Sequence, residues 1–421
     1  METGQQLVQR HAEKIVVESL GAFRAVVLHG PRQAGKTTLA RLIANRLGVT
    51  YTTLDDDAER AAAQADPDGY VAAYGPPLVL DEIQRAGEPL VLAVKSAVDR
   101  DPRPGRFLLT GSSNFLTVPA ISETLAGRTD IVELWPLAQS ELNNSTTFVD
   151  RVLSDGADAM VSHSAEPAVR KDYFDLVCRG GFPEARAMTD RSRRRWFSAY
   201  LKTVLDREIT DSRDIRDREA LESMVRYFAA TTAQELVMTR VANRLGIARD
   251  TAERYQPWLE RVFLIQRTPG WGRGLTAKIV QRPKIYMVDT GLAAALIGRD
   301  SHALLRPTEP AAGPLLETLV AGELTRQLSW SNTEARLFHL REREGREVDL
   351  VMETADGRVI GVEVKAATTA RSDDFKGLKF LRDRLDLAGV PFLVGIVLHT
   401  GPHRHSFGDR LAALPISDLW R

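Results

Sequence analysis

The sequence predicts an α/β protein in which a domain with a parallel sheet and a phosphate-binding loop precedes helical segments and a second α/β domain. Three patterns favour this class. Close to residue 30, a short apolar run enters a glycine-rich loop and then a helix. Amphipathic helices separated by a turn occupy the middle of the chain, and a helix followed by apolar strands with carboxylates lies after residue 315.

The composition is that of a folded protein with more than one domain. The chain has 421 residues, of which 43% are hydrophobic and 27% are charged. At about 150 residues per domain this length predicts two or three domains, each able to bury a core. The apolar content excludes a disordered chain. Basic and acidic residues number 56 each, which excludes a uniformly basic surface for nucleic acid.

Cysteine usage and hydropathy predict a cytoplasmic protein without a membrane partner. Cys178 is the single cysteine, so neither an internal disulfide nor a cysteine-rich zinc site can form. Residues Met1 to Val17 lack the apolar stretch of a signal peptide. Apolar runs such as Pro391 to Leu398 are too short to span a bilayer.

A phosphate-binding loop follows the apolar run Ala25 to His29. It has the form G-x-x-x-x-G-K-[ST] and leads into a helical pattern that ends near Gly48. Its glycines let backbone N–H groups surround a phosphate, and the helix adds its positive N-terminus. Lys36 would reach the β- and γ-phosphates, and the Thr37 hydroxyl would bind Mg²⁺. The loop residues expected to hold ATP or GTP are Gly30, Pro31, Arg32, Gln33, Ala34, Gly35, Lys36, Thr37 and Thr38.

An apolar strand that ends in two acids favours nucleotide hydrolysis. Residues Pro77 to Leu80 precede Asp81 and Glu82. We expect Asp81 to hold Mg²⁺ through water and Glu82 to orient the attacking water. A buried strand with polar end residues would explain the pair by itself, but its combination with the loop favours hydrolysis.

Two further positions are candidates for the same site. The strand Arg106 to Thr110 runs into polar residues 112–114, one of which would sense the γ-phosphate unless these residues only form a turn. Arg128 precedes the strand Ile131 to Leu134. It could stabilise charge in the transition state or simply lie at the surface, and the pattern does not separate these roles.

The segments GPRQAGKT, LVLDEIQ, LLTGSSN and LAGRTDIVELWPL resemble AAA-type ATPases of bacteria and archaea that carry a C-terminal domain of unknown function. In that family these segments serve as Walker A, Walker B, sensor 1 and a functional arginine. The resemblance implies that Asn114 is the sensor and that Arg128 is the functional arginine, acting within its chain or on a neighbour. It also implies ATP rather than GTP, because no guanine-reading N-K-x-D stretch is present.

The middle of the chain predicts a connector and a DNA-binding module. From Pro136 to about Ile215 the pattern is helical, which resembles the small helical lid and connector of that family. Helical segments at Leu221 to Thr231, Thr239 to Leu245 and Asp250 to Phe263 are then typical of a helix-turn-helix, followed by a β-hairpin wing. A winged helix used only for packing has the same pattern.

Local charge favours DNA contact by this module. Residues 261–284 hold six basic and no acidic side chains, the kind of excess that phosphate contacts need. Residues 240–284 hold 10 bases and 3 acids, whereas residues 51–101 hold 11 acids and 4 bases. The neutral total is therefore a cancellation between unlike regions. The first contacts expected with DNA are Arg249, Arg254, Arg273 and Lys278.

The last part of the chain carries carboxylates around a predicted hairpin. Glu363 and Lys365 are two apart on one strand, so their side chains share a face, and Asp349 on the preceding strand can lie beside them. Two carboxylates at this separation bind Mg²⁺ or Mn²⁺. The lysine can orient water or offset charge on a phosphodiester. Glu317, from the helix Leu315 to Leu328, could complete the metal shell.

This segment resembles the PD-(D/E)xK nuclease superfamily. Glu317, Asp349, Glu363 and Lys365 match its helix acid, its motif aspartate and its ExK pair, although Val348 stands in place of the motif's proline. The resemblance implies an α/β restriction-endonuclease-like domain that cuts DNA with Mg²⁺ or Mn²⁺. A solvated strand face and a nuclease fold that only binds DNA are the alternatives.

Together these patterns predict a P-loop ATPase with a parallel sheet at 1–137, a helical lid and connector at 138–215, a winged helix-turn-helix at 216–300 and a nuclease-like domain at 301–421. The leading hypothesis is an ATPase, with ATP and Mg²⁺ as cofactors, that acts on DNA in repair or in the handling of branched DNA. The alternative is a nucleotide-dependent switch that binds DNA or a protein without cutting it. A homo-oligomer is compatible with either. A small-molecule kinase shares the loop, but nothing in the sequence suggests an acceptor site.

Overall fold

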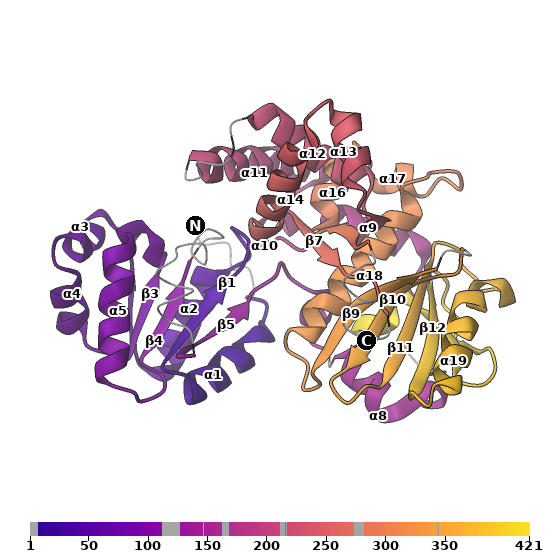
Figure 1. Ribbon diagram of the computed structural model, residues 1–421, viewed down its shortest axis with the longest axis horizontal. Coiled ribbons are helices and arrows are strands. Elements are labelled where there is room, and N and C mark those ends of the chain that lie inside the picture. Colours follow the sequence, from indigo (N-terminus) through magenta and orange to yellow (C-terminus); the bar gives the residue numbers. More distant parts are fainter. Residues whose placement is uncertain are drawn as a thin grey trace. The chain divides into compact units, whose positions relative to one another are not determined.

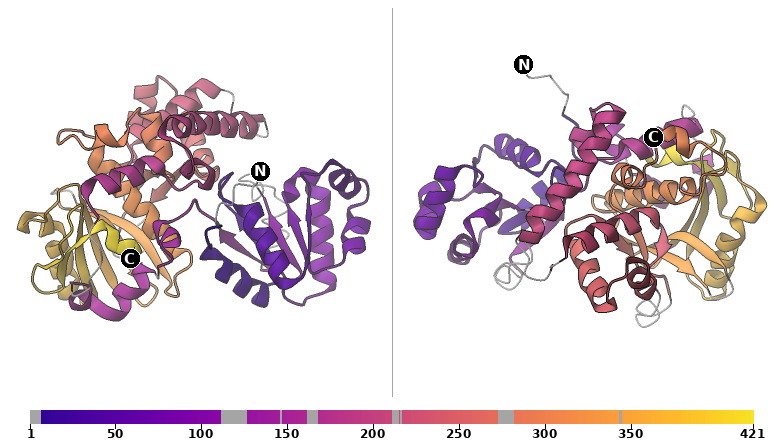
Figure 2. Two further views of the ribbon diagram at one scale, coloured as in Figure 1. Left: turned by 180° about the vertical axis from the view of Figure 1, so that it is seen from behind. Right: turned by 90° about the horizontal axis from the view of Figure 1, so that it is seen from above.

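The structure is a computed structural model that describes residues 7–111, 127–145, 147–161, 168–210, 215, 217–272, 282–342 and 345–421. Contacts between residues divide the chain into two compact units, which can be followed in Figure 1 and Figure 2. Unit 1 comprises Met1–Leu137 with Arg261–Phe263, and unit 2 comprises Ala138–Glu260 with Leu264–Arg421. The main segment of unit 1 thus ends at Leu137, which is also the last residue of the first predicted domain. The predicted boundaries at 215 and 300 both fall inside unit 2 and stay predictions.

Unit 1 is built on a parallel five-stranded sheet (Figure 1). Its strands follow the order β2-β3-β4-β1-β5, and each neighbouring pair is parallel. The strands are β1 (Ala25–His29), β2 (Thr50–Thr53), β3 (Leu78–Asp81), β4 (Phe107–Thr110) and β5 (Thr129–Glu133). The helices are α1 (Ala12–Ala22), α2 (Lys36–Leu47), α3 (Asp57–Ala65), α4 (Pro67–Tyr74) and α5 (Glu88–Arg100), with the 3₁₀ turn η1 (Ile83–Ala86). The α/β class and the parallel sheet predicted for this part are confirmed.

The alternation of side chains along the strands gives unit 1 two hydrophobic faces. On β1, Ala25 and Val27 belong to a core that includes residues of α3, α4 and α5, whereas Val26 and Leu28 belong to a core with α1 and α2. Successive side chains of a strand point to opposite faces, so helices cover both sides of the sheet. The carboxyl ends of β1, β3 and β4 therefore lie at one edge of the sheet, where open α/β sheets bind ligands.

Unit 2 begins with helices, in the segment for which the sequence predicts a helical connector. They are α7 (Gln139–Leu142), α8 (Phe148–Val161), α9 (Arg170–Arg179), α10 (Pro183–Arg186) and α11 (Asp190–Thr210). A run of arginines before Trp196 lies in the first turns of α11. One of them, Arg193, is buried and donates from Nε to the carbonyl oxygen of Ala185 at 3.0 Å. This arginine joins α11 to the preceding turn of the chain.

A small antiparallel sheet accompanies the predicted helix-turn-helix. The elements follow in the order α12 (Arg218–Ala230), β6 (Gln234–Glu235), α13 (Met238–Leu245), α14 (Arg249–Arg261), β7 (Ile265–Thr268) and β8 (Lys284–Met287). The strands lie in the order β6-β8-β7, and both pairs are antiparallel. Gly246 ends α13 in the left-handed conformation, with φ of 68°, and so allows the short turn into α14. Helices α16 (Thr290–Leu296) and α17 (Ser301–Leu304) follow.

The last part of unit 2 is a mixed sheet flanked by helices. Its strand order is β13-β14-β12-β11-β10-β9. Strand β10 is antiparallel to both β9 and β11; strands β11, β12 and β14 are parallel, and β13 is antiparallel to β14. Leucines of α19, among them Leu378 and Leu381, share a buried core with Val348 of β10. The elements are α18 (Ala312–Leu328), β9 (Ala335–Arg341), β10 (Glu347–Thr354), β11 (Val359–Lys365), η3 (Ser372–Phe375), α19 (Lys376–Leu387), β12 (Phe392–His399), β13 (His405–Ser406), β14 (Leu411–Pro415) and η4 (Ile416–Trp420).

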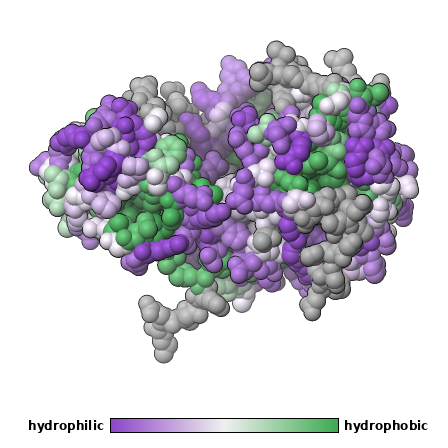
Figure 3. Space-filling view, turned by 90° about the horizontal axis from the view of Figure 1, so that it is seen from below, coloured by the Kyte–Doolittle hydropathy of each residue, from purple (hydrophilic) through white to green (hydrophobic). Residues whose placement is uncertain are grey.

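The surface of the described residues mixes polar and apolar side chains. On the face drawn in Figure 3, hydrophilic residues predominate and hydrophobic residues form separate areas among them. Exposed large apolar side chains such as Leu92, Ile131 and Leu387 belong to different elements, which is usual for a protein surface. Within the described ranges, no helix has the length and apolar character needed to cross a membrane.

Candidate functional site

The predicted phosphate-binding loop joins β1 to α2 and has the backbone that requires its glycines. Gly30 has φ of 155°, and a Cβ there would lie 2.1 Å from the carbonyl oxygen of Leu134; Gly35, with φ of 100°, directly precedes α2. Lys36 is buried, and its Nζ donates to the carbonyl oxygens of Gly30 and Pro31, each at 2.9 Å. The ammonium therefore lies against a turn whose N–H groups and helix N-terminus suit a phosphate. The turn also contains Arg32, Gln33 and Ala34, and Thr38 lies in the first turn of α2.

The structure brings Thr37 and Asp81 together, as the sequence predicts for a magnesium pair. Thr37 lies at the start of α2, and Asp81 is the last residue of β3. Oγ1 of Thr37 lies 3.2 Å from Oδ1 and 3.1 Å from Oδ2 of Asp81, which is 1% exposed. A hydroxyl and a carboxylate are oxygen ligands of the type that Mg²⁺ prefers. These two residues therefore fit a magnesium ion that accompanies a bound nucleotide.

Glu82 follows Asp81 where the chain leaves the sheet, and its backbone is held in an unusual conformation. Its φ is 54°, in the left-handed region. For a residue other than glycine this backbone conformation costs free energy, and it persists only where the surrounding structure holds it. The Glu82 N–H donates to Oγ1 of Thr110 at 3.0 Å, and the Gln84 amide donates to the Glu82 carboxylate. Both contacts keep Glu82 beside Asp81, at the sheet edge that carries the phosphate-binding loop.

Sequence reasoning missed three hydroxyl groups that contact Asp81, and one of them, Oγ1 of Thr53, donates to Asp81 Oδ2 at 3.3 Å. Thr110, the last residue of β4, is buried and donates to Asp81 Oδ1. Tyr51 of β2 donates from Oη to Asp81 Oδ2 at 2.8 Å, and Arg41 lies over its ring, 4.9 Å from the centroid. Burial raises the pKa of Tyr51 to about 12, so this hydroxyl stays protonated at neutral pH. These contacts follow from the strand order, because β3, which ends in Asp81, lies between β2 and β4.

We expect Thr110→Val to lower the turnover number for ATP by about 10- to 100-fold, since a hydrogen bond to a charged group is worth about 1.5–3 kcal/mol. The change removes the hydroxyl that joins Asp81 to the Glu82 backbone and keeps the side-chain shape. Steady-state ATP hydrolysis measures the effect, and Thr110→Ser, which retains the hydroxyl, should stay near the wild-type rate. Equal rates for the valine variant and the wild type would remove this role for Thr110.

Arg128 lies away from the phosphate-binding loop of its own chain. It directly precedes β5, which runs parallel to β1 with Ala25 opposite Thr129. Arg128 is therefore at the edge where β1 begins, whereas the loop leaves the other end of that strand. Its Nε pairs with Oδ1 of Asp99 at 2.6 Å. A role of Arg128 in hydrolysis would require the site of another copy and stays a prediction. Asn114, the expected sensor, lies outside the described residues.

In unit 2 the predicted hairpin brings Asp349, Glu363 and Lys365 together. Strands β10 and β11 pair in the antiparallel register that places Asp349 beside Glu363. The Asp349 N–H donates to Glu363 Oε2 at 3.3 Å, and the Val364 N–H donates to Asp349 Oδ2 at 2.9 Å. Nζ of Lys365 donates to Glu363 Oε1 at 2.7 Å. The two strands therefore present these three polar side chains on one face of the sheet.

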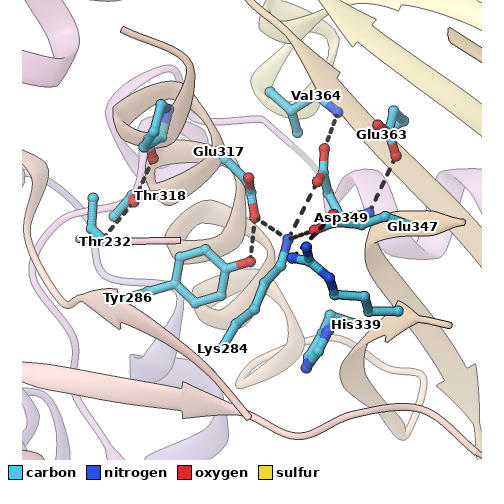
Figure 4. A network of polar contacts seen from close by, with 12 residues as sticks. Thr232, Lys284, Tyr286, Glu317, Thr318, His339, Glu347, Asp349, Glu363 and Val364 are labelled. Carbon is cyan, nitrogen blue, oxygen red and sulfur yellow. Dashed lines mark hydrogen bonds and ion pairs between the residues drawn. The ribbon is translucent and has the colours of Figure 1, made fainter. Parts of the chain in front are cut away.

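Lys284 of β8 lies among several carboxylates, one of which is that of Asp349 (Figure 4). In the sequence analysis this lysine belongs to the basic residues of the predicted DNA-binding module. Its Nζ is 2.8 Å from Glu317 Oε1, 3.0 Å from Glu347 Oε1 and 3.3 Å from Asp349 Oδ1. Its side chain is 2% exposed. Tyr286, two residues along the same strand, donates from Oη to Glu317 Oε1 at 2.6 Å. We call Glu317, Glu347, Asp349 and Glu363 the carboxylate cluster.

The predicted metal ligands Glu317, Asp349 and Glu363 lie beside a buried lysine in this arrangement, and a metal ion at them stays a prediction. In the part of the chain that the structure describes, no group of three or more His, Cys, Asp or Glu side chains is placed to hold a metal ion. Instead, the ammonium of Lys284 contacts two of the three expected ligands. Burial disfavours the charged ammonium, but the carboxylates outweigh burial and raise the pKa of Lys284 above its usual value. A protein cation therefore stands where the sequence predicts a metal ion.

The residues expected to contact DNA are only partly within the described chain. Arg249 and Arg254 lie exposed on α14, and Arg249 pairs at 2.7 Å with a glutamate one turn later. Arg273 and Lys278 lie outside the described residues. Because Lys284 is buried, the basic excess that residues 261–284 can offer to phosphates is smaller than the sequence count. Among the four residues expected to contact DNA, Arg249 and Arg254 are the two that the structure describes, and both are exposed.

Three known families match successive parts of the chain. Residues 22–143 match a family described as an AAA domain, residues 170–303 match a domain of unknown function (DUF8612), and residues 312–419 match another domain of unknown function (DUF4143). The first match agrees with the phosphate-binding loop and the Thr37–Asp81 pair described above. Unit 1 is an AAA-type P-loop ATPase domain that binds ATP. The other two matches assign no activity to unit 2.

Two mycobacterial proteins are similar over nearly the whole chain. They are uncharacterized proteins, Mb2031c of Mycobacterium bovis and Rv2008c of Mycobacterium tuberculosis, each 28% identical over 415 residues, which is 98% of this chain and 84% of theirs. Among solved structures, the Walker-type ATPase PABY2304 of Pyrococcus abyssi is 14% identical, with 69% of this chain and 96% of that chain covered and a TM-score of 0.43. The RuvB Holliday junction branch migration motor of Thermotoga maritima is 22% identical, with 61% and 89% covered and a TM-score of 0.30. Similarity at these TM-scores supports no argument about function.

Proposed function

We propose that the chain couples Mg²⁺-dependent ATP hydrolysis in unit 1 to DNA binding by unit 2. Hydrolysis rests on one arrangement, in which Thr37, Asp81 and Glu82 meet at the carboxyl ends of the parallel strands. Mg²⁺ held by Thr37 and Asp81 would neutralise charge on the phosphates. Glu82 is positioned to orient the water that attacks the γ-phosphate, and Lys36 to balance charge on the β- and γ-phosphates.

The proposed DNA-binding module is α12 to β8. Its order of helix, strand, two helices and two strands supports a winged helix-turn-helix, a motif in which the last helix lies in the major groove. Here that helix is α14, which carries the exposed Arg249 and Arg254. Arginines that neutralise phosphates release counterions, so this binding should depend strongly on salt. Repair and the handling of branched DNA are the processes in which we expect such an ATPase to act.

The double variant Arg249→Ala/Arg254→Ala should weaken binding to all DNA sequences alike, and each lost phosphate contact should reduce the salt slope of log K by about 1. Fluorescence anisotropy with labelled single-stranded, duplex and branched DNA at several salt concentrations measures both quantities. Arg46→Ala is the control, because this arginine of unit 1 is also exposed, with 62% of its side chain accessible. Unchanged affinity and salt slope in the double variant would exclude this DNA-binding surface and leave ATP hydrolysis in place.

Metal-dependent DNA cleavage by unit 2 is a second candidate function, favoured by the hairpin geometry. Asp349, Glu363 and Lys365 lie together as the PD-(D/E)xK resemblance implies, with Lys365 hydrogen-bonded to Glu363. Helix α18 with Glu317 also precedes the hairpin of β10 and β11, the order in which the sequence places them. If unit 2 does not cut, the same fold serves to bind DNA or a protein under control of the nucleotide.

In an assay of DNA cutting with Mg²⁺ or Mn²⁺, Lys365→Ala is expected to abolish cleavage and to leave ATP hydrolysis unchanged. The lysine is placed to offset charge on the phosphodiester, and it belongs to unit 2 rather than to the ATPase domain. Lys376→Ala is a matched control, since 74% of that lysine side chain is exposed. If the full chain cuts no single-stranded, duplex or branched DNA with or without ATP, the cleavage function is wrong and the binding function stands.

A further inference from the structure

The buried ammonium of Lys284 contacts three of the four members of the carboxylate cluster. Lys284 Nζ lies within 3.3 Å of oxygens from Glu317, Glu347 and Asp349, and Glu317 and Asp349 have side chains only 13% and 11% exposed. Carboxylates this deeply buried are costly unless a cation or several hydrogen bonds compensate them. A positive charge at the centre of the cluster therefore stabilises it, and in this structure Lys284 provides that charge (Figure 4).

The ammonium uses the same oxygen atoms that a divalent ion would use. Mg²⁺ binds oxygens at about 2.0–2.1 Å and Mn²⁺ uses the same kinds of ligand. The Lys284 nitrogen, 2.8 Å from Glu317 Oε1 and 3.3 Å from Asp349 Oδ1, already occupies a position that contacts both oxygens. Two positive ions cannot occupy that space together, because their repulsion adds to the steric conflict.

Lys284 reaches the cluster from the small sheet, not from the sheet that carries Asp349. In β8, Lys284 pairs with Thr268 of β7 and Glu235 of β6. Lys284 and Tyr286 are two apart on this strand, and both contact Glu317 of α18. The position of the ammonium thus depends on β8, a strand of the proposed DNA-binding module.

We propose that Lys284 is the resident cation of the carboxylate cluster and that it excludes a divalent metal ion, which enters only when Lys284 is withdrawn or replaced. The cluster is then a metal site that the chain itself keeps closed. A shift of β8 on DNA binding is the event that would withdraw the lysine. This inference deepens the second candidate function, but metal binding tests it without any requirement for DNA cleavage.

The test measures Mn²⁺ binding to the nucleotide-free full chain, from the loss of the electron paramagnetic resonance signal of free Mn²⁺. Every protein carries Asp81→Asn, which removes the magnesium ligand of unit 1. The proposal predicts no binding at the cluster with Lys284, and binding of one ion per chain in Lys284→Met, whose side chain has similar length without charge. Lys284→Arg keeps the charge and should bind none. Adding Asp349→Asn to the methionine variant should abolish the binding.

Two results would overturn the proposal. One is Mn²⁺ binding that is equally tight with Lys284 and with methionine and is lost in both on Asp349→Asn, since ammonium and metal would then coexist. The other is the absence of binding in Lys284→Met, since the ammonium position would then not be a metal position. If the methionine variant does not fold without metal, refolding with Mn²⁺ decides the matter. Recovery of the native melting transition supports the proposal, because a ligand that binds only the folded state stabilises it, and failure to recover contradicts it.

Cleavage assays separate this inference from the proposed function. If Lys284→Met binds Mn²⁺ and cuts DNA faster than the wild type, both are supported. If it binds Mn²⁺ and cuts no DNA, the closed metal site is supported and the cleavage function is wrong.

Discussion

Lys36→Ala is expected to reduce ATP hydrolysis by at least about 10²- to 10³-fold, the usual cost of removing one group that stabilises charge in a transition state. The Lys36 ammonium lies against the loop carbonyls of Gly30 and Pro31, where it can turn to the β- and γ-phosphates. Phosphate release in the presence of Mg²⁺ measures the rate, and binding of a fluorescent ATP analogue measures affinity. Both should fall.

The control for this variant is Lys14→Ala. Lys14 lies on α1 of the same unit, its side chain is 61% exposed, and it pairs with Glu18 one turn away. Its loss should leave hydrolysis unchanged. A Lys36→Ala protein that keeps the wild-type rate while its melting temperature is also unchanged would contradict the role assigned to the loop.

Glu82→Gln should separate ATP binding from ATP hydrolysis. Glutamine keeps the size of the side chain but cannot accept a proton from water, and loss of such general-base assistance typically costs about 10²- to 10⁴-fold in rate. The residues that hold the phosphates and Mg²⁺ are untouched, so ATP affinity should stay near that of the wild type. Single-turnover hydrolysis and equilibrium binding of ATP, measured on the same protein, give the two quantities.

Glu88→Gln serves as the matched control for Glu82→Gln. Glu88 is exposed in the first turn of α5, shortly after Glu82 in the chain. Its rate should equal that of the wild type. If Glu82→Gln still turns over ATP at the wild-type rate, another residue orients the water.

The nucleotide site was predictable where its chemistry follows from neighbouring residues. Gly30, Gly35, Lys36 and Thr37 belong to one short motif, and a strand that ends in Asp81 needs only a local apolar pattern. The contact of Thr110 with Asp81 was not predictable in this way, because it depends on which strands are neighbours in the sheet. Strand order is set by the packing of the whole unit, so no short segment of the sequence predicts it.

The carboxylate cluster shows the same limit more clearly. The hairpin spacing predicts that Asp349 lies beside Glu363, and the structure has this contact. Lys284, however, lies in a run that is basic in sequence, and its charge favoured DNA contact. Burial decides its role instead, since its partners Glu317 and Asp349 come from later parts of the chain. Sequence reveals the charge of a residue but not its exposure when the partners are distant.

The coupling of nucleotide to DNA is tested most directly by the DNA affinity of the Glu82→Gln protein with Mg²⁺ and ATP, with Mg²⁺ and ADP, and without nucleotide. Because this variant should hold ATP without consuming it, each state can be measured at equilibrium at one salt concentration. The proposed function predicts that affinity with ATP differs from affinity with ADP by about 5- to 150-fold, the usual range of coupling between two sites, and that Lys36→Ala shows no such difference. The same DNA affinity in all three states of Glu82→Gln would contradict it.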